Sequence, residues 1–179
     1  PRYTYSFRGE LNWNNFDFSI FFQGVGKRDW YPMAGNTSGV SAWDFWGPYS
    51  RSSTGFIHKD FESMCYSVDN PNGYFPRQRG YQAYSNGALG VINDRYLQNV
   101  SYLRLKNLSL GYTFNFKNKV IQSIRLGVSG DNLWYWSPLK KYCKTMDPEM
   151  AVTAGTHVNN SGVGYAISSV YSFNLDIKF

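Results

Sequence analysis

Hydrophobic and polar residues alternate along five separate stretches of this chain, most clearly over its last ten residues. One side of that stretch consists of Tyr171, Phe173, Leu175, Ile177 and Phe179, and the other of Ser172, Asn174, Asp176 and Lys178. Because successive side chains of a strand point to opposite faces, this pattern predicts a strand with one apolar and one polar face. We therefore expect the chain to end on a strand.

The same alternation predicts four further strands. Together with the last one, they are expected at about residues 3–13, 16–24, 101–116, 123–132 and 167–179. Asn14 and Asn15 form a two-residue turn of the kind that joins antiparallel strands, because Asn tolerates positive φ. A second short turn follows at residues 117–122. The alternation slips by one residue at Lys106 and Asn107, which predicts a β-bulge.

Two long segments without periodicity, at about residues 27–99 and 133–164, separate these strands. Loops of this length are uncommon in a compact soluble domain. In outer-membrane barrels, however, short turns join the strands at one end and long loops join them at the other. The two short turns and the C-terminus are expected at one end of the sheet, and both long loops at the other.

Composition favours a membrane barrel over a soluble sheet without excluding the latter. Aromatic residues make up 19% of the 179 residues, with 15 tyrosines, and charged residues only 17%. Membrane barrels place aromatic residues at both water interfaces. No apolar run approaches the roughly 20 residues of a membrane-spanning helix. Since five strands cannot close a barrel, we expect a segment of a larger one. The alternative is a soluble carbohydrate-binding β-sandwich.

Charge and motifs exclude several other functions. The net charge is +6, but the Lys and Arg residues are scattered and form no continuous basic stripe, so nucleic-acid binding is not expected. His58 and His157 are isolated in loops, and Asp60 and Glu62 near His58 lack a fixed metal-binding spacing. The segment from Asp147 to Glu149 is better explained as a turn capped by Asp before Pro. We predict no enzymatic activity, metal or cofactor.

The two cysteines suggest a structural hypothesis. Cys65 and Cys143 lie in different long loops, on the same side of the membrane in the expected topology. That side is oxidising, which favours disulfides. A disulfide between the two loops is therefore one possibility, and two free thiols are the other.

Loop aromatics and strand polar residues are the candidate binding residues. Trp and Tyr side chains suit sugar rings and protein interfaces, although they can also form a small core within the loops. The candidates for contact with substrate or a lid protein are Trp30, Tyr31, Trp43, Trp46, Tyr49 and Trp134. The polar strand residues expected to line a barrel lumen are Arg8, Glu10, Arg125, Asp131, Asp176 and Lys178.

Several sequence blocks resemble one known family. They are Tyr102-Leu-Arg-Leu-Lys-Asn-Leu-Ser-Leu-Gly-Tyr112, Arg125-Leu-Gly-Val-Ser-Gly-Asp-Asn-Leu133, Asp147-Pro-Glu149 and the terminal strand ending in Phe179. The segments Pro1-Arg-Tyr-Thr-Tyr5 and Phe21-Phe-Gln-Gly-Val-Gly-Lys-Arg-Asp-Trp30 look similar to the same family. In this order the blocks resemble the C-terminal barrel of SusC/RagA-type TonB-dependent transporters, and they extend over almost the whole chain.

The resemblance implies a function that the alternation alone does not. It implies an all-β, antiparallel transmembrane barrel of about 22 strands, of which this chain supplies about five. It also implies import of glycans or oligopeptides across the outer membrane of a Bacteroidota-like bacterium, with a SusD-like lipoprotein as lid and pairs that can dimerise. TonB would act through a plug and TonB box, which residues 1–179 lack. Phe179, as a C-terminal aromatic residue, is implied to be a barrel assembly signal.

Overall fold

A computed structural model describes residues 1–31, 59–77, 93–117, 120–144, 146–151 and 167–179. The described residues form two compact units. The sheet unit consists of Pro1–Arg28, Ser101–Ser137 and Ile167–Phe179, and the loop unit consists of Asp29–Val100 and Pro138–Ala166. No helix within the described ranges is long and apolar enough to span a membrane.

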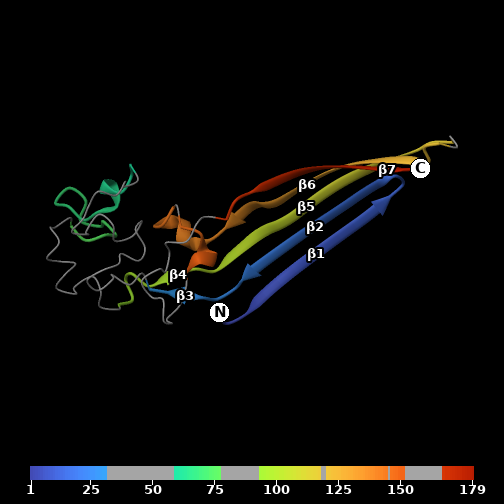
Figure 1. The fold of residues 1–179 in the computed structure, drawn as a ribbon. Coiled ribbons are helices and arrows are strands. Elements are labelled where there is room, and N and C mark those ends of the chain that lie inside the picture. The colour runs from blue at the N-terminus through green and yellow to red at the C-terminus, as the bar shows by residue number, and fades with distance from the viewer. Residues whose placement is uncertain (32–58, 78–92, 118–119, 145, 152–166) are drawn as a thin grey trace, which may run out of the picture. The chain divides into compact units, whose positions relative to one another are not determined.

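The sheet unit is one antiparallel sheet of five strands in the order β1-β2-β5-β6-β7 (Figure 1). The strands are β1 (Thr4–Trp13), β2 (Phe16–Val25), β5 (Tyr102–Asn115), β6 (Ser123–Trp136) and β7 (Val170–Lys178). The predicted all-β, antiparallel fold class is confirmed. β6 continues to Trp136, four residues beyond its expected end, and β7 begins at Val170, three residues after its expected start.

The short connections lie at one end of the sheet. Asn14, in the β1–β2 turn, has a φ of 56°, a conformation that Asn adopts more readily than most residues. The C-terminus lies at the same end (Figure 1), because Leu175 of β7 pairs with Leu126 of β6, in the first half of that strand.

The expected bulge is present in β5. Phe21 and Phe22 are adjacent in β2, but they pair with Asn107 and Leu105, so that β5 has one extra residue, Lys106, between them. Because of the extra residue, odd-numbered residues point to the apolar face before the bulge and even-numbered residues point to it after the bulge. The extra residue therefore keeps the leucines on both sides of Lys106 on the same face of the sheet.

The register of the strands places apolar side chains on one face of the sheet and mainly polar side chains on the other. Directly paired residues point to the same face. One row that crosses all five strands is therefore apolar, and it consists of Leu11, Phe18, Leu110, Val128 and Phe173. The next row towards the turns consists of Trp13, Phe16, Tyr112, Leu126 and Leu175. Among the described residues nothing covers these side chains, and Phe173 is 86% exposed.

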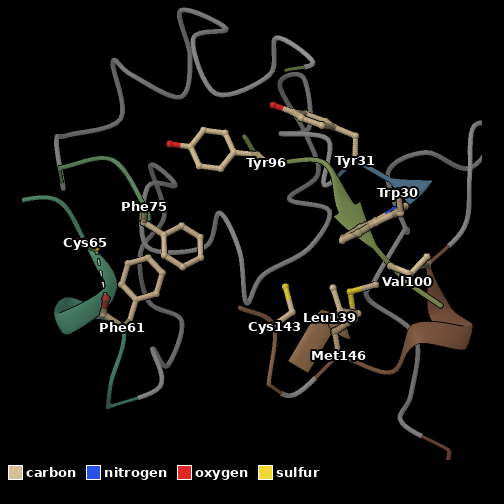
Figure 2. Packing of buried hydrophobic residues seen from close by; sticks show 11 residues of the cluster. Trp30, Tyr31, Phe61, Cys65, Phe75, Tyr96, Val100, Leu139, Cys143 and Met146 are labelled. Atoms are coloured by element: carbon tan, nitrogen blue, oxygen red, sulfur yellow. Dashed lines mark hydrogen bonds between the residues drawn. The ribbon is translucent and has the colours of Figure 1, made fainter. Parts of the chain in front are cut away.

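The loop unit has a small hydrophobic core of its own (Figure 2). Its regular elements are short: β3 (Asp29–Trp30), β4 (Gln98–Asn99) and the 3₁₀ turns η2 (Glu62–Met64), η3 (Pro138–Lys141) and η4 (Pro148–Met150). β3 and β4 pair with each other. The buried core residues are Trp30, Tyr31, Phe61, Cys65, Phe75, Tyr96, Val100, Leu139, Cys143, Met146 and Ala151. Four distant sequence segments thus share one core.

Candidate functional site

The six predicted lumen-lining residues all lie on the polar face of the sheet. Arg8 is in the row of Phe21, Asn107 and Asp131, and Glu10 is in the row of Ser19 and Ser109. The remaining positions follow from direct pairing, since Arg125 is opposite Asp176 and Lys178 is opposite Ser123. The structure thus brings these residues together on one face. Their exposure to a barrel lumen stays a prediction.

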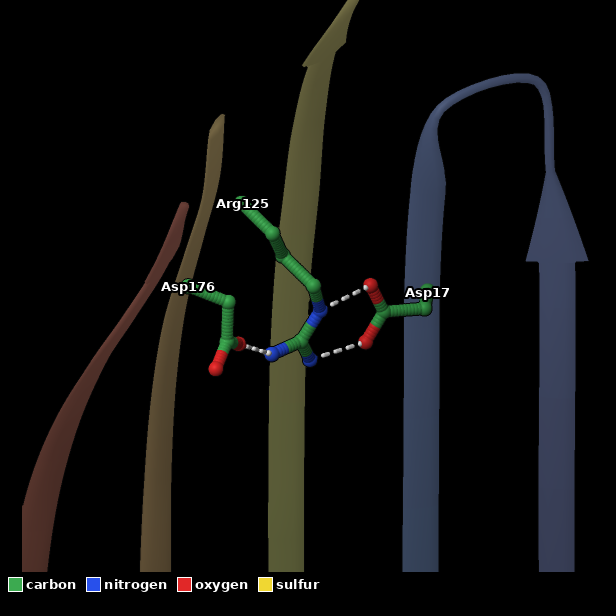
Figure 3. Close-up of polar contacts among 3 residues, drawn as sticks. All are labelled: Asp17, Arg125 and Asp176. Carbon is green, nitrogen blue, oxygen red and sulfur yellow. Dashed lines mark hydrogen bonds and ion pairs between the residues drawn. The ribbon is translucent and has the colours of Figure 1, made fainter. Parts of the chain in front are cut away.

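A bridge of three charged residues crosses this face (Figure 3). Arg125 of β6 donates two hydrogen bonds to Asp17 of β2, from Nε to Oδ1 at 2.9 Å and from Nη2 to Oδ2 at 2.6 Å. Its Nη1 donates to Asp176 Oδ2 of β7 at 3.2 Å. A bidentate contact between Arg and a carboxylate fixes the relative orientation of the two side chains in addition to pairing their charges. We call these three residues the Arg125 bridge.

Glycine in the intervening strand makes this bridge possible. β5 lies between β2 and β6, so the Arg125 side chain crosses β5 to reach Asp17. A Cβ at Gly111 would lie 2.4 Å from Asp17 Oδ1 and 2.5 Å from Arg125 Nη2. A Cβ at Gly127 would lie 3.1 Å from Arg125 Nη1. The absence of a side chain at position 111 is therefore a requirement of the bridge in its observed geometry.

One ion pair and one further hydrogen bond lie elsewhere on the polar face. Arg8 Nε donates to Glu10 Oε1 at 2.7 Å, and both side chains are largely exposed. Asp131 Oδ1 accepts a hydrogen bond of 2.8 Å from Asn107 Nδ2. Exposed ion pairs such as the first contribute little to stability, so these residues remain available to other partners.

Sequence analysis missed one buried charge, Arg104 of β5. Its side chain is only 1% exposed. The guanidinium carbon lies 4.7 Å from the centre of the Tyr135 ring and 5.9 Å from that of the Tyr102 ring. A cation between aromatic faces is stabilised by their negative potential. Arg104 lies between Leu103 and Leu105, before the bulge in β5, and its position on the polar face was the only feature of the sequence that could have indicated its role.

The predicted aromatic contact residues do not form one exposed site. Trp30 and Tyr31 are buried in the core of the loop unit, which is the packing alternative considered from the sequence. Trp134 belongs instead to β6, where it pairs with Leu105 and is 51% exposed. Trp43, Trp46 and Tyr49 lie outside the described residues. A substrate or lid-protein role for this set stays a prediction.

Tyr74 connects three segments of the loop unit. Its ring stacks on Tyr142 with centroids 3.6 Å apart. Its hydroxyl donates to the Arg95 carbonyl at 2.6 Å and accepts from Gln98 Nε2 at 2.8 Å. Arg95 in turn donates from Nη2 to the Gly73 carbonyl at 2.7 Å. Burial raises the pKa of Tyr74 to about 12, and burial likewise raises the pKa of Tyr96.

Other candidate residues have structural roles or fall outside the description. Asp147 caps η4, since its Oδ1 accepts from the Glu149 backbone N–H at 2.9 Å, as expected for a capped turn. Asp60 pairs with Lys144 at 2.9 Å. Within the described ranges no three His, Cys, Asp or Glu side chains could together hold a metal ion. His58 and His157 lie outside those ranges.

The disulfide hypothesis is wrong in this structure. Cys65 and Cys143 are both buried free thiols in the core of the loop unit (Figure 2). The Cys65 thiol donates a weak hydrogen bond to the Phe61 carbonyl at 3.4 Å. Small apolar side chains of this kind pack well in a core without cross-linking. Sharing one core therefore does not require the two cysteines to bond.

The architecture of the sheet is typical of one structural class. A single antiparallel sheet with one apolar and one polar face, and with short turns at one end, is the architecture typical of a segment of an outer-membrane type of barrel. The solved RagAB peptide importer in its "closed-closed" state has a similar fold, with a TM-score of 0.51 and 20% identity. That similarity covers 82% of this chain and 14% of the importer chain. Barrel closure itself needs more strands than the five that the described residues contribute to this sheet.

Sequence comparison then identifies the relatives. The chain is 29% identical over 136 residues to TonB-dependent receptor P3 of Formosa agariphila, which covers 74% of this chain and 12% of that receptor. It is 23% identical over 168 residues to TonB-dependent receptor P26 of the same organism, which covers 92% of this chain and 14% of the receptor. No family model matches the chain. The chain is thus related to a segment of TonB-dependent receptors, not to enzymes, and the resemblance inferred from the motifs is confirmed.

Proposed function

We propose that this chain is the C-terminal part of the barrel of a TonB-dependent importer in the outer membrane of a Bacteroidota-like bacterium. One observation supports this most strongly, the apolar face that continues across all five strands. A soluble protein would leave such a face uncovered only at a large cost, because each exposed aromatic side chain forgoes about 1.5–3 kcal/mol of burial. Lipid chains would cover the whole face at once.

Strand lengths and residue placement agree with a membrane wall. β1 and β2 are ten residues long. A tilted strand needs about 9–11 residues to cross the hydrocarbon layer of a membrane. Trp13 and Phe16 lie at the turn end of the apolar face, and Trp134 and Trp136 lie at its opposite end. Aromatic residues at both ends of an apolar band form the interface girdles of membrane barrels.

Orientation and partners follow from the same proposal. The long loops face the outside and the C-terminus faces the periplasm, because outer-membrane barrels have their short turns on the periplasmic side. The polar face, with Arg8, Glu10 and the Arg125 bridge, lines the lumen. A SusD-like lipoprotein covers the extracellular end, TonB drives import through segments outside residues 1–179, and two such pairs can associate. The substrate class is glycans or oligopeptides.

The aromatic composition of the loops supports a binding role for the extracellular end. Tyr74 and Tyr142 present a stacked pair that is only half-buried, and Arg95 and Lys141 lie within 5.9 Å and 5.1 Å of these rings. Aromatic faces beside cations suit both sugar rings and peptide carboxylates. Within this proposal, direct contact with substrate or lid protein is expected at Trp43, Trp46 or Tyr49, since Trp30 and Tyr31 are buried in the loop core and Trp134 lies at the end of the apolar face.

The soluble β-sandwich is the less favourable alternative. A sandwich buries one face of each sheet against a second sheet. In the described part of the chain, the only second sheet is the pairing of β3 with β4, two residues each. That pairing is far too small to cover a face of five strands.

The test uses the intact protein that contains these residues, expressed in a bacterium with an outer membrane. Membranes are washed with alkaline carbonate and then extracted with detergent, and uptake of fluorescent casein peptides and fluorescent malto-oligosaccharides is measured with and without a protonophore. We expect the protein in the detergent extract of the outer membrane, and energy-dependent uptake of one probe. Recovery in the soluble fraction would contradict the membrane assignment, and uptake insensitive to the protonophore would contradict energised import.

A further inference from the structure

The last strand has an alternation that does not define its own register. Its apolar positions are Tyr171, Phe173, Leu175 and Ile177, all bulky and all on one face. A slip of one residue would turn this face over and is strongly disfavoured. A slip of two residues keeps every apolar side chain on the same face. Hydrophobic pattern therefore cannot distinguish the observed pairing from one shifted by two.

The other strands have constraints that β7 lacks. The two-residue turn at Asn14 and Asn15 fixes β1 against β2, since loop length and turn type set hairpin register. The bulge at Lys106 fixes β5 against β2. β7 follows β6 only after residues 137–169 and pairs with it over nine residues without a bulge. The connection is too long to set the pairing of β7.

The polar face of β7 offers one charged contact to β6. Asp176 pairs directly with Arg125, and its carboxylate accepts a hydrogen bond from Nη1 at 3.2 Å (Figure 3). The neighbouring polar positions of β7 are small and neutral, Ser172 opposite Ser129 and Asn174 opposite Gly127. Ser169 Oγ also donates to the Asn132 carbonyl at 2.8 Å, but that contact is uncharged and lies beyond the strand. A shift by two would remove the carboxylate from opposite Arg125.

Arg125 itself is held in place by the rest of the sheet. Its two hydrogen bonds to Asp17 across Gly111 fix the guanidinium relative to β2 and β5. Its side chain is 30% exposed and that of Asp17 34%, whereas that of Asp176 is 68% exposed. The guanidinium is therefore a pre-positioned donor with one N–H group directed to the incoming strand.

We propose that the Arg125 bridge selects the register in which β7 joins the sheet. Asp17 and Gly111 position the guanidinium, and Asp176 recognises it. Because the Arg125–Asp176 contact is partly solvated, its contribution is modest, and for comparable exposed pairs it amounts to a preference of about five-fold at most. A modest difference is sufficient here, since the competing registers differ in little else. The role is independent of the substrate and holds whatever the protein imports.

The test moves the carboxylate along β7 without changing composition or charge. In the intact protein, Asp176→Asn is combined with Asn174→Asp, so that a shift of two residues restores a carboxylate opposite Arg125. Register is measured with a short thiol-specific bifunctional cross-linker in two reporter pairs. Ser129→Cys with Ser172→Cys reports the observed pairing, and Ser129→Cys with Val170→Cys reports the shifted pairing.

We expect the ratio of observed to shifted cross-link to fall about threefold in D176N, as for loss of an exposed ion pair. The ratio should fall further in the combined variant, which gains the shifted contact. Lys178→Gln is the matched control, because it removes a charge from the same face of β7 outside the bridge, and it should leave the ratio unchanged. An unchanged ratio in both test variants would overturn the proposal, as would an equal change in K178Q.

Loss of the folded protein is distinguished from loss of register by the same measurement. A variant that merely lowers stability reduces both cross-links together and leaves their ratio constant. Arg125→Gln provides a second line of evidence, since it removes the donor common to both registers. It should bring the ratios of the native and combined chains closer together. The cross-link ratio would then be compared between native β7 and the combined variant, once with Arg125 and once with R125Q. An equally large difference in both backgrounds would also overturn the proposal.

Discussion

At the scale of single residues, neighbouring positions of one strand have opposite environments. Phe173 belongs to the apolar row in the middle of the sheet, and Asn174 beside it belongs to the polar face. The sequence predicted this division because the side-chain period of a strand is two. It could not predict the Arg125 bridge, because residues 17 and 125 are separated by more than a hundred positions and meet only through strand order.

Substitution by Arg should therefore have very different effects at these two positions. In the intact protein, Phe173→Arg should lower the free energy of unfolding by about 2–4 kcal/mol, because the charge enters the apolar row that faces lipid in the proposed barrel. Asn174→Arg is the control and should cost much less. Urea unfolding in phospholipid vesicles, followed by Trp fluorescence, measures both. Equal losses would show that the two faces have been assigned wrongly.

Tyr74 gives the loop unit a specific pH dependence. Burial raises its pKa to about 12, above the ordinary value of 10.0. A raised pKa means that the folded state favours the neutral phenol. The contribution of Tyr74 to the stability of the loop unit is therefore complete below pH about 10 and is lost between about pH 10 and 12. Tyr74→Phe should reduce this dependence, and part of it should remain because burial also raises the pKa of Tyr96.

Tyrosinate absorbance and limited proteolysis of the loop unit, followed between pH 8 and pH 12, test this prediction in the native and Y74F proteins. We expect the native loop unit to become protease-sensitive as Tyr74 ionises. The variant should be more sensitive at neutral pH, since it cannot donate to the Arg95 carbonyl, and should change less with pH. Parallel pH profiles in the two proteins would show that another group is responsible.

At the scale of elements, the accuracy of sequence analysis depended on unbroken alternation. β1 and β2 were predicted within a residue at each end, because, apart from Gly9 and Gly24, every second residue is large and apolar. β6 was predicted to end at residue 132, because the alternation is lost there. In the structure Asn132 has a φ of 52°, and the strand continues beyond this irregularity to Trp136. β3 and β4 were missed because two residues cannot display a period. The core of the loop unit was unpredictable because it joins four segments without any regular spacing.

The β1–β2 turn allows a direct test of backbone conformation. Asn14 has a φ of 56°, which a β-branched residue adopts only with strain. Asn14→Val should therefore destabilise the hairpin by about 1–2 kcal/mol, whereas Asn14→Gly should be nearly neutral. Thermal unfolding of the detergent-solubilised intact protein compares them. A valine variant as stable as the glycine variant would exclude a positive φ at this position.

At the scale of the whole molecule, the uncovered apolar face dominates behaviour. Its exposed side chains extend from β1 to β7, and both outer edges of the sheet are unpaired among the described strands. Open edges and an apolar face together favour uncontrolled association. If the intact protein is the membrane barrel proposed above, such a sheet must reach the membrane before it aggregates, and the end of the last strand is a candidate signal for that delivery.

Phe179 follows directly after β7 and is 73% exposed. We predict that its deletion sharply reduces the amount of intact protein in the outer membrane, while molecules that do insert keep nearly normal heat resistance. The reason is that burial of one aromatic side chain at the interface contributes only about 1–2 kcal/mol, too little to unfold a large barrel. Phe116→Ala removes another exposed aromatic residue near the turn end and is the control.

Quantitative immunoblotting of outer membranes and the temperature of the gel-mobility shift measure these two properties separately. A normal amount of protein with a lowered shift temperature would mean that Phe179 serves only as an interface aromatic residue. Equal reductions in membrane amount for the deletion and for F116A would mean that the effect is not specific to the C-terminal position.

The burial of both cysteines has a practical consequence for following the loops in living cells. Cys65 is 5% exposed and Cys143 is 0% exposed, so a membrane-impermeant maleimide can reach them only when the loop unit opens. Their modification rate is then a measure of the opening equilibrium, in the same way that amide exchange reports local unfolding. In the orientation proposed above, cells carrying the natural protein could thus be assayed for loop opening with and without a transported probe, with the maleimide as the only added label and no tag or engineered residue.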